Sequence, residues 1–164
     1  MPGGTWADLG AGTGTFTRAL RELLGPNGVV YAVDRSEQAV RALRRLAPHD
    51  GAALEVLHAD FTGRLELPPL DGVLMANALH YARDQAAVLR RITALLRPGG
   101  RVVLVEYDRT HGNRWVPFPV PPERFRTLAA EAGLGAPREL GRRPSAYWRE
   151  MYAAAAQRPE PGVR

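Results

Sequence analysis

Glycine and aspartate residues recur in this chain at spacings that suit the binding of a cofactor. The segment Asp8-Leu9-Gly10-Ala11-Gly12-Thr13-Gly14 places three glycines at alternate positions, so its backbone can turn tightly and a ligand can approach it closely. Asp34 and Asp60 each follow a predicted strand, and Asp34 could accept hydrogen bonds from both ribose hydroxyls of an adenosine-containing cofactor. The glycine loop alone is a weak signal, but the loop followed by these two acids predicts a cofactor site.

Simpler explanations exist for each of these residues. The glycines could form an ordinary tight turn, Asp34 could cap the next helix, and Asp60 could belong to an Asp-Phe-Thr-Gly turn. A dinucleotide-binding loop would need its third glycine at Thr15, so the spacing disfavours a pyrophosphate as the ligand.

The elements that must position these residues alternate between strands and helices. Short strands are expected at residues 5–9, 29–33, 54–59, 72–76 and 101–107, with two more near 136–142 and 146–153. Helices are expected after the glycine loop, after Ser36, after Asp84 and over 123–132, and residues 61–70 have room for one helical turn at most. The inward face of the first helix is expected to carry Phe16, Ala19, Leu20, Leu23 and Leu24.

Such alternation predicts an α/β fold in which helices cover both faces of a doubly wound, mostly parallel sheet. We expect one domain over residues 1–156 and a disordered tail over 157–164. In an open parallel sheet, ligands bind beyond the carboxyl ends of the strands, which is where the glycine loop, Asp34 and Asp60 fall.

The amino-acid composition excludes several classes of catalytic and metal site. The 164 residues include no cysteine, which excludes disulfides, thiolate metal sites and cysteine nucleophiles. The net charge is +5 and every basic residue except histidine is arginine, so Schiff-base chemistry on a lysine is excluded. The arginines are scattered, which favours codon bias over a nucleic-acid surface. Neither a signal peptide nor a membrane-spanning run is visible, so the sequence predicts a cytoplasmic protein.

At about residues 4–134 the sequence resembles the class I S-adenosylmethionine-dependent methyltransferases. Asp8 to Gly14 is similar to their first motif, D/E-x-G-x-G-x-G, and Leu96-Arg97-Pro98-Gly99-Gly100 matches their turn before the fifth strand. The resemblance implies the family's Rossmann-like fold of seven strands with an antiparallel last strand. It also implies S-adenosylmethionine as cofactor, with Gly10, Gly12 and Gly14 along its methionine part and Asp8 supporting the loop.

The same resemblance assigns the rest of the cofactor site. Asp34 would hold the ribose hydroxyls, Asp60 and Phe61 would lie against adenine, and Asn77 would lie along the methionine part. Arg35 stands where the family usually has an apolar residue that packs on adenine. The family's amino-terminal lid helix has no counterpart before the first strand, so we expect either an open site or a homodimer in which a partner subunit covers it.

The acceptor is expected to be a small molecule. Asn77-Ala78-Leu79-His80 resembles the N-x-L-H pattern of small-molecule methyltransferases of the quinone-biosynthesis type, and it lacks the Pro-Pro motif of enzymes that methylate amino groups of nucleic acids and proteins. The candidate general bases are His80, Tyr81 and His111, followed by Asp108 and Glu106. A packed or solvated role is the simpler alternative for each histidine, and no spacing suggests a metal site.

The sequence leaves alternatives for the role of the loop around Trp115 and for the function of the protein. Trp115, Phe118 and the neighbouring prolines could wall a substrate pocket, form a rigid loop or make a dimer contact. The alternative functions are a non-catalytic module that binds the cofactor or a partner, an RNA methyltransferase and, more remotely, a nicotinamide-dependent oxidoreductase.

Overall fold

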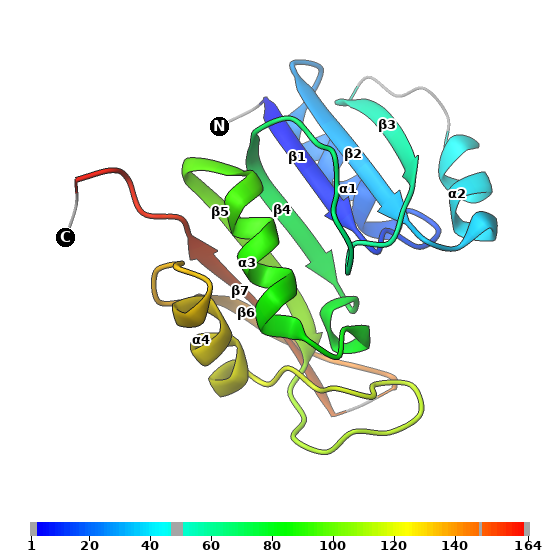
Figure 1. The fold of residues 1–164 in the computed structure, drawn as a ribbon. Coiled ribbons are helices and arrows are strands. Elements are labelled where there is room, and N and C mark those ends of the chain that lie inside the picture. The colour runs from blue at the N-terminus through cyan, green and yellow to red at the C-terminus, as the bar shows by residue number, and fades with distance from the viewer. Residues whose placement is uncertain (1–2, 47–50, 148, 163–164) are drawn as a thin grey trace.

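Strands and helices alternate along the chain in the computed structural model, which describes residues 3–46, 51–147 and 149–162. Figure 1 shows their arrangement. In chain order they are β1 (Gly4–Leu9), α1 (Thr15–Leu24), β2 (Gly28–Asp34), α2 (Glu37–Arg44), β3 (Ala53–His58), β4 (Leu70–Ala76), the 3₁₀ turn η1 (Leu79–Tyr81), α3 (Gln85–Leu95), β5 (Leu96–Tyr107), α4 (Pro122–Glu131), β6 (Arg138–Pro144) and β7 (Glu150–Gln157).

The strands of the described residues form one seven-stranded sheet in the order β3-β2-β1-β4-β5-β7-β6. The pairs from β3 through β5 are parallel, whereas β7 is antiparallel to both β5 and β6. This confirms the predicted doubly wound sheet with an antiparallel last strand. The strand order reverses between β1 and β4, so the carboxyl ends of β1, β2 and β4 meet at the place where such sheets bind ligands.

Helices cover both faces of this sheet. Figure 1 shows α3 and α4 side by side in front of it and α1 behind it. Val73 and Met75 of β4 belong to the larger core cluster, which includes α3 and α4, while Leu74 belongs to the cluster with α1. The two-residue period of a strand sends neighbouring side chains to opposite faces, and here it supplies both cores.

The inward face of α1 differs from the predicted one. Leu20 and Leu24 are buried as expected. Phe16, Ala19 and Leu23 are exposed instead, Leu23 by 78%, and Thr17 and Arg21 complete the inward face. These two polar side chains find partners inside: Thr17 donates to Asp8, and Nε of Arg21 donates to the Ala52 carbonyl at 2.7 Å. Hydrogen bonding therefore turns the helix away from the face that apolar spacing alone predicts.

Other local predictions agree with the structure. Ser36 caps α2 by accepting from the Ala39 amide, and Asp84 caps α3 by accepting from the Ala87 amide. Residues 61–69 form no helix. The turn at Pro98-Gly99-Gly100, however, differs from the prediction: it lies inside β5, which begins at Leu96 because Leu96 already pairs with Leu70 of β4.

Two residues at the start of the predicted tail, Gln157 and Arg158, are bound to the rest of the fold. Gln157 is the last residue of β7, and the guanidinium of Arg158 donates to the carbonyls of Thr93 and Leu96. In the described residues, no helix is long and apolar enough to cross a membrane.

Candidate functional site

The glycine loop joins β1 to α1 in a backbone shape that only glycine adopts easily. Gly10 and Gly12 have φ values of +75° and +56°, in the left-handed region. A Cβ on Gly10 would lie 2.7 Å from the Cβ of Ala78, so the β1 and β4 ends pack closely there. A Cβ on Gly12 would meet nothing within 4 Å, because this part of the loop faces open space.

Asp34 ties the loop to the next strand and helix. One carboxylate oxygen accepts from the Gly12 amide and the other from the Ser36 amide, both at 2.8 Å. Each carboxylate oxygen has two lone-pair sites, so each keeps one for a ligand. The residue that caps α2 is Ser36 and not Asp34. The Asp34 carboxylate lies instead at the mouth of the glycine loop.

Asp8 supports the loop from below. Its carboxylate is buried and accepts from the Thr17 hydroxyl at 2.6 Å. Burial, opposed by the Thr17 hydrogen bond and assisted by the nearby charge of Asp34, raises the pKa of Asp8 to about 6.

Asp60 combines a turn with a place at the site. One of its oxygens accepts from the amide and the hydroxyl of Thr62, and the other lies 4.0 Å from the Arg35 guanidinium. The Thr62 hydrogen bonds, with a smaller contribution from Arg35, lower the pKa of Asp60 despite its partial burial. Asp60 is therefore an anion at neutral pH.

These residues enclose a cavity of about 290 Å³, called here the glycine-loop cavity. It is lined by Gly10, Gly12, Asp34, Arg35, Asp60, Phe61, Thr62, Asn77, Ala78 and Tyr81. Seven of the nine predicted cofactor residues line it: Gly10, Gly12, Asp34, Arg35, Asp60, Phe61 and Asn77. The other two, Asp8 and Gly14, lie behind the loop, where a Cβ on Gly14 would come within 2.7 Å of Leu46.

Asn77 follows β4 in a conformation that is unusual for a residue with a side chain. Its φ is +51°, and its amide donates to the Val105 carbonyl at 2.8 Å. Its side-chain oxygen is buried and has no hydrogen-bond partner. A buried acceptor without a partner is costly, so this oxygen is suited to receive a hydrogen bond from a ligand.

His80 and Glu106 form a buried pair beside Asn77. Nδ1 of His80 lies 2.7 Å from Glu106, and the amide of His80 donates to the same carboxylate at 3.2 Å. A carboxylate only accepts, so Nδ1 carries the proton and the lone pair of a neutral ring lies on Nε2. Among the described residues Nε2 has no hydrogen-bond partner.

The His80 ring lines a second cavity of about 700 Å³, called here the aromatic cavity. Its lining residues are Asn77, His80, Tyr81, Tyr107, Arg109, Asn113, Trp115, Val116, Ala146 and Tyr147. Asn77 and Tyr81 line both cavities, so the two spaces adjoin at these residues. Burial, with the charge of Glu106, raises the pKa of Tyr107, so this phenol stays protonated at neutral pH.

The loop after β5 carries Trp115 and Phe118, and the structure shows which of them lines the aromatic cavity. Trp115 lines the aromatic cavity, whereas Phe118 lies outside its lining and holds the loop in place through its backbone, which bonds His80 and Gln85. His111 lines neither cavity, and its ring bonds the neighbouring Thr110.

Sequence reasoning missed the pairing of His80 with Glu106 and the part of the aromatic cavity contributed by Tyr107, Asn113 and Tyr147. The available signal for the first was a carboxylate inside the apolar run of β5. No short-range signal marks the second, because these residues come from three separate segments.

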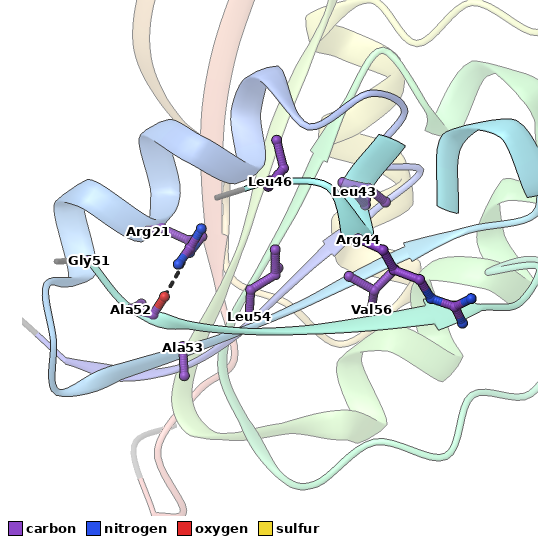
Figure 2. Close-up of a pocket in the computed structure, with 9 residues that line it drawn as sticks. All are labelled: Arg21, Leu43, Arg44, Leu46, Gly51, Ala52, Ala53, Leu54 and Val56. Carbon is purple, nitrogen blue, oxygen red and sulfur yellow. Dashed lines mark hydrogen bonds between the residues drawn. The ribbon is translucent and has the colours of Figure 1, made fainter. Parts of the chain in front are cut away.

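Another hollow, of about 520 Å³, lies between α1, α2 and the start of β3 (Figure 2). Figure 2 shows Leu43, Leu46, Leu54 and Val56 around it, with Arg21 bonded to Ala52. It lies away from the carboxyl ends of the strands and holds none of the predicted site residues. No group of three or more metal-ligating side chains occurs within the described part of the chain.

Comparison with known proteins identifies the family. Residues 7–102 match a family model described as "Methyltransferase domain". A ubiquinone/menaquinone biosynthesis C-methyltransferase UbiE from Burkholderia mallei is 30% identical over 119 residues, which cover 71% of this chain and 47% of that protein. The chain belongs to the class I S-adenosylmethionine-dependent methyltransferases.

Solved methyltransferase structures share the fold. An arsenic(III) S-adenosylmethionine methyltransferase from Chlamydomonas reinhardtii aligns with a TM-score of 0.77 at 20% identity, over 99% of this chain and 66% of that one. A Burkholderia thailandensis 1,6-didemethyltoxoflavin-N1-methyltransferase, solved with 1,6-didemethyltoxoflavin and S-adenosylhomocysteine, gives 0.76 at 22% identity, over 97% and 72%. The chain spans less than half of the length of the first curated relatives it matches.

The residues of the glycine-loop cavity fit S-adenosylmethionine. Asp34 keeps acceptor sites for two ribose hydroxyls, the loop is open at Gly12, and Asn77 offers an unpaired buried acceptor to the polar methionine part. The anions Asp34 and Asp60 on the cavity wall also favour a ligand that carries positive charge.

Proposed function

We propose that this protein transfers a methyl group from S-adenosylmethionine to a small-molecule acceptor by in-line displacement. The observation that carries the proposal is the junction of the two cavities at Asn77 and Tyr81. A cofactor in the glycine-loop cavity and an acceptor in the aromatic cavity would meet there. Holding two reactants in this way lowers the entropic part of the barrier.

In this proposal different residues of the chain bind different parts of the cofactor. Asp34 binds the ribose hydroxyls, Asp60 and Phe61 bind the adenine, and Gly10 and Gly12 allow the methionine part to approach the backbone. Bound S-adenosylmethionine supplies a methyl carbon on a sulfonium, which a nucleophile can attack while the bonding electron pair leaves with sulfur.

His80 is proposed as the general base. Glu106 holds Nδ1 of His80, which leaves the lone pair on Nε2 at the wall of the aromatic cavity to take the proton of the acceptor. Tyr81, at the junction, is proposed to orient the acceptor. His111 faces neither cavity, so its predicted catalytic role has no support from its position.

Calorimetric titration with S-adenosylhomocysteine tests the cofactor assignment. We expect micromolar binding by the wild type and a loss of about 100-fold in Asp34→Ala, since two hydrogen bonds to a charged group are removed. Glu37→Ala is the matched control, because Glu37 is an exposed acid nearby that pairs only with Arg41 in the described residues.

Wild-type protein that binds nothing at millimolar ligand would contradict the proposal. An equal loss in Asp34→Ala and Glu37→Ala would do the same. A thermal melt of each variant separates a lost contact from a failure to fold.

The homodimer and the cytoplasmic location that the sequence favours stay predictions. Light scattering on the purified chain tests the first, and a mass twice that of one chain is the expected result.

A further inference from the structure

Three separate segments bring aromatic side chains to the aromatic cavity. Tyr107 ends β5, Trp115 lies in the loop over residues 108–121, and Tyr147 lies between β6 and β7. Trp115 is 68% exposed and Tyr147 is 88% exposed. Several large aromatic side chains that are exposed around one cavity indicate a binding surface, whereas single exposed aromatic residues do not.

The loop that carries Trp115 is well held. Asn113 accepts from the amides of Trp115 and Val116, and the backbone of Phe118 bonds both His80 and the Gln85 side chain. The backbone of Trp115 is thus held by hydrogen bonds before any ligand arrives, which lowers the cost of ordering this loop on binding.

The size of the cavity suits a small molecule. Its volume of about 700 Å³ falls within the range of ligand pockets. Aromatic side chains stack best on flat rings, in offset or edge-to-face geometry. Tyr107, Trp115 and Tyr147 therefore favour a planar ring system over a flexible chain.

The charges around the cavity restrict its ligand further. The described lining residues include no carboxylate, and Arg109 is the one arginine among them. A second arginine, Arg114, lies with its guanidinium 5.2 Å from the centroid of the Trp115 ring. Glu106 stands behind His80 and is already paired with it. Among the described residues that line the cavity, an ammonium group would find no carboxylate to pair with.

We propose that the aromatic cavity binds a flat aromatic acceptor that is neutral or anionic, with its polar edge toward His80 and Asn77. This inference rests on the proposed methyl transfer for the acceptor's role, but the binding itself does not. The inner end of the cavity is polar and the mouth is aromatic, so the ring stacks outside while the group to be methylated points inward.

A charge series of naphthalene compounds tests the proposal. Calorimetry with 2-naphthol, 2-naphthoate and 2-naphthylmethylammonium, each with and without saturating S-adenosylhomocysteine, compares a neutral, an anionic and a cationic ligand on one ring system. We expect 2-naphthol or 2-naphthoate to bind at least about tenfold more tightly than the ammonium compound.

Three variants locate the binding. Trp115→Ala and Tyr147→Ala should each weaken 2-naphthol about tenfold, because each removes a stacking partner. Phe118→Ala is the matched control: it is an aromatic residue of the same loop that lies outside the cavity lining, and its hydrogen bonds come from its backbone.

The outcomes separate the two proposals. Binding of S-adenosylhomocysteine with no binding of any naphthalene compound, or tightest binding of the ammonium compound, overturns the aromatic acceptor and leaves methyl transfer standing. Naphthol binding without cofactor binding overturns the methyl transfer instead.

A nucleic-acid base could also stack on these rings. A single-stranded RNA oligonucleotide is therefore included as a competitor at low and high salt. Salt-sensitive RNA binding that Trp115→Ala abolishes, together with absent naphthol binding, would replace the small-molecule acceptor with RNA.

Discussion

The pair His80–Glu106 is the residue-scale feature on which the chemistry depends. Both side chains are almost fully buried, and the carboxylate bonds the ring and the amide of His80 together. A buried carboxylate with two donors from one residue fixes the orientation of that residue. In the proposed mechanism Glu106 is thus a positioning residue, and His80 is the group that would meet the acceptor.

Substitution of this pair should affect turnover more than binding. With any acceptor that the protein methylates, His80→Gln is expected to lower kcat about 100-fold or more, the ordinary contribution of a general base. Glu106→Gln should lower kcat by a smaller factor. The dissociation constant for S-adenosylhomocysteine should not change, because neither residue lines the glycine-loop cavity.

A useful comparison is His111→Gln, since His111 lies outside both cavities and should keep full activity. If His111→Gln lost as much activity as His80→Gln, the assignment of the base to His80 would be wrong.

Asp8 makes stability depend on pH. Its folded pKa of about 6 is above the ordinary value of 3.8, so the folded state binds this proton more tightly than the unfolded state does. The stabilisation is complete below the ordinary pKa and is lost as pH rises through the folded pKa.

Asp8→Asn removes this titration and keeps an acceptor for Thr17. Between pH 4 and pH 7, the unfolding free energy of the wild type should fall relative to that of Asp8→Asn by on the order of 3 kcal/mol. Urea titrations of both proteins at the two pH values measure the difference. A wild-type protein that gains stability relative to the variant over this range would contradict the raised pKa.

At the scale of elements, α1 shows where apolar spacing misleads. Its leucines predict one face, but the partners offered by Asp8 and Ala52 draw Thr17 and Arg21 inward instead. The strands were predicted well because their burial follows from simple runs and alternation, and the caps at Ser36 and Asp84 follow from side-chain chemistry in the adjacent turn.

The corrected face of α1 has a direct consequence for stability. Leu20 is 7% exposed and Leu23 is 78% exposed. Leu20→Ala should cost about 2–5 kcal/mol, as other buried leucines do, whereas Leu23→Ala should change the unfolding free energy by less than about 0.5 kcal/mol. Chemical denaturation measures both changes in unfolding free energy. Equal changes in the two variants would support the inward face that the apolar spacing predicts, with both leucines buried.

At the scale of the whole molecule, most of the glycine-loop cavity was predictable, whereas the aromatic cavity was predictable only in part, through Asn77, His80, Tyr81 and Trp115. Parallel strands bring their carboxyl ends to one edge, so Gly12, Asp34 and Asp60 had to meet once the sheet was recognised. Tyr107 and Tyr147 come together only because β7 returns antiparallel beside β5. A single sequence carries no local signal for that kind of contact.

Cofactor and acceptor are proposed to meet at Asn77 and Tyr81. The most direct measurement is a crystal structure of this protein with S-adenosylhomocysteine. The account predicts the ligand in the glycine-loop cavity, with its ribose hydroxyls within hydrogen-bond distance of Asp34 and its sulfur facing the junction with the aromatic cavity. A ligand bound instead in the hollow between α1, α2 and β3, or with its ribose away from Asp34, would contradict it.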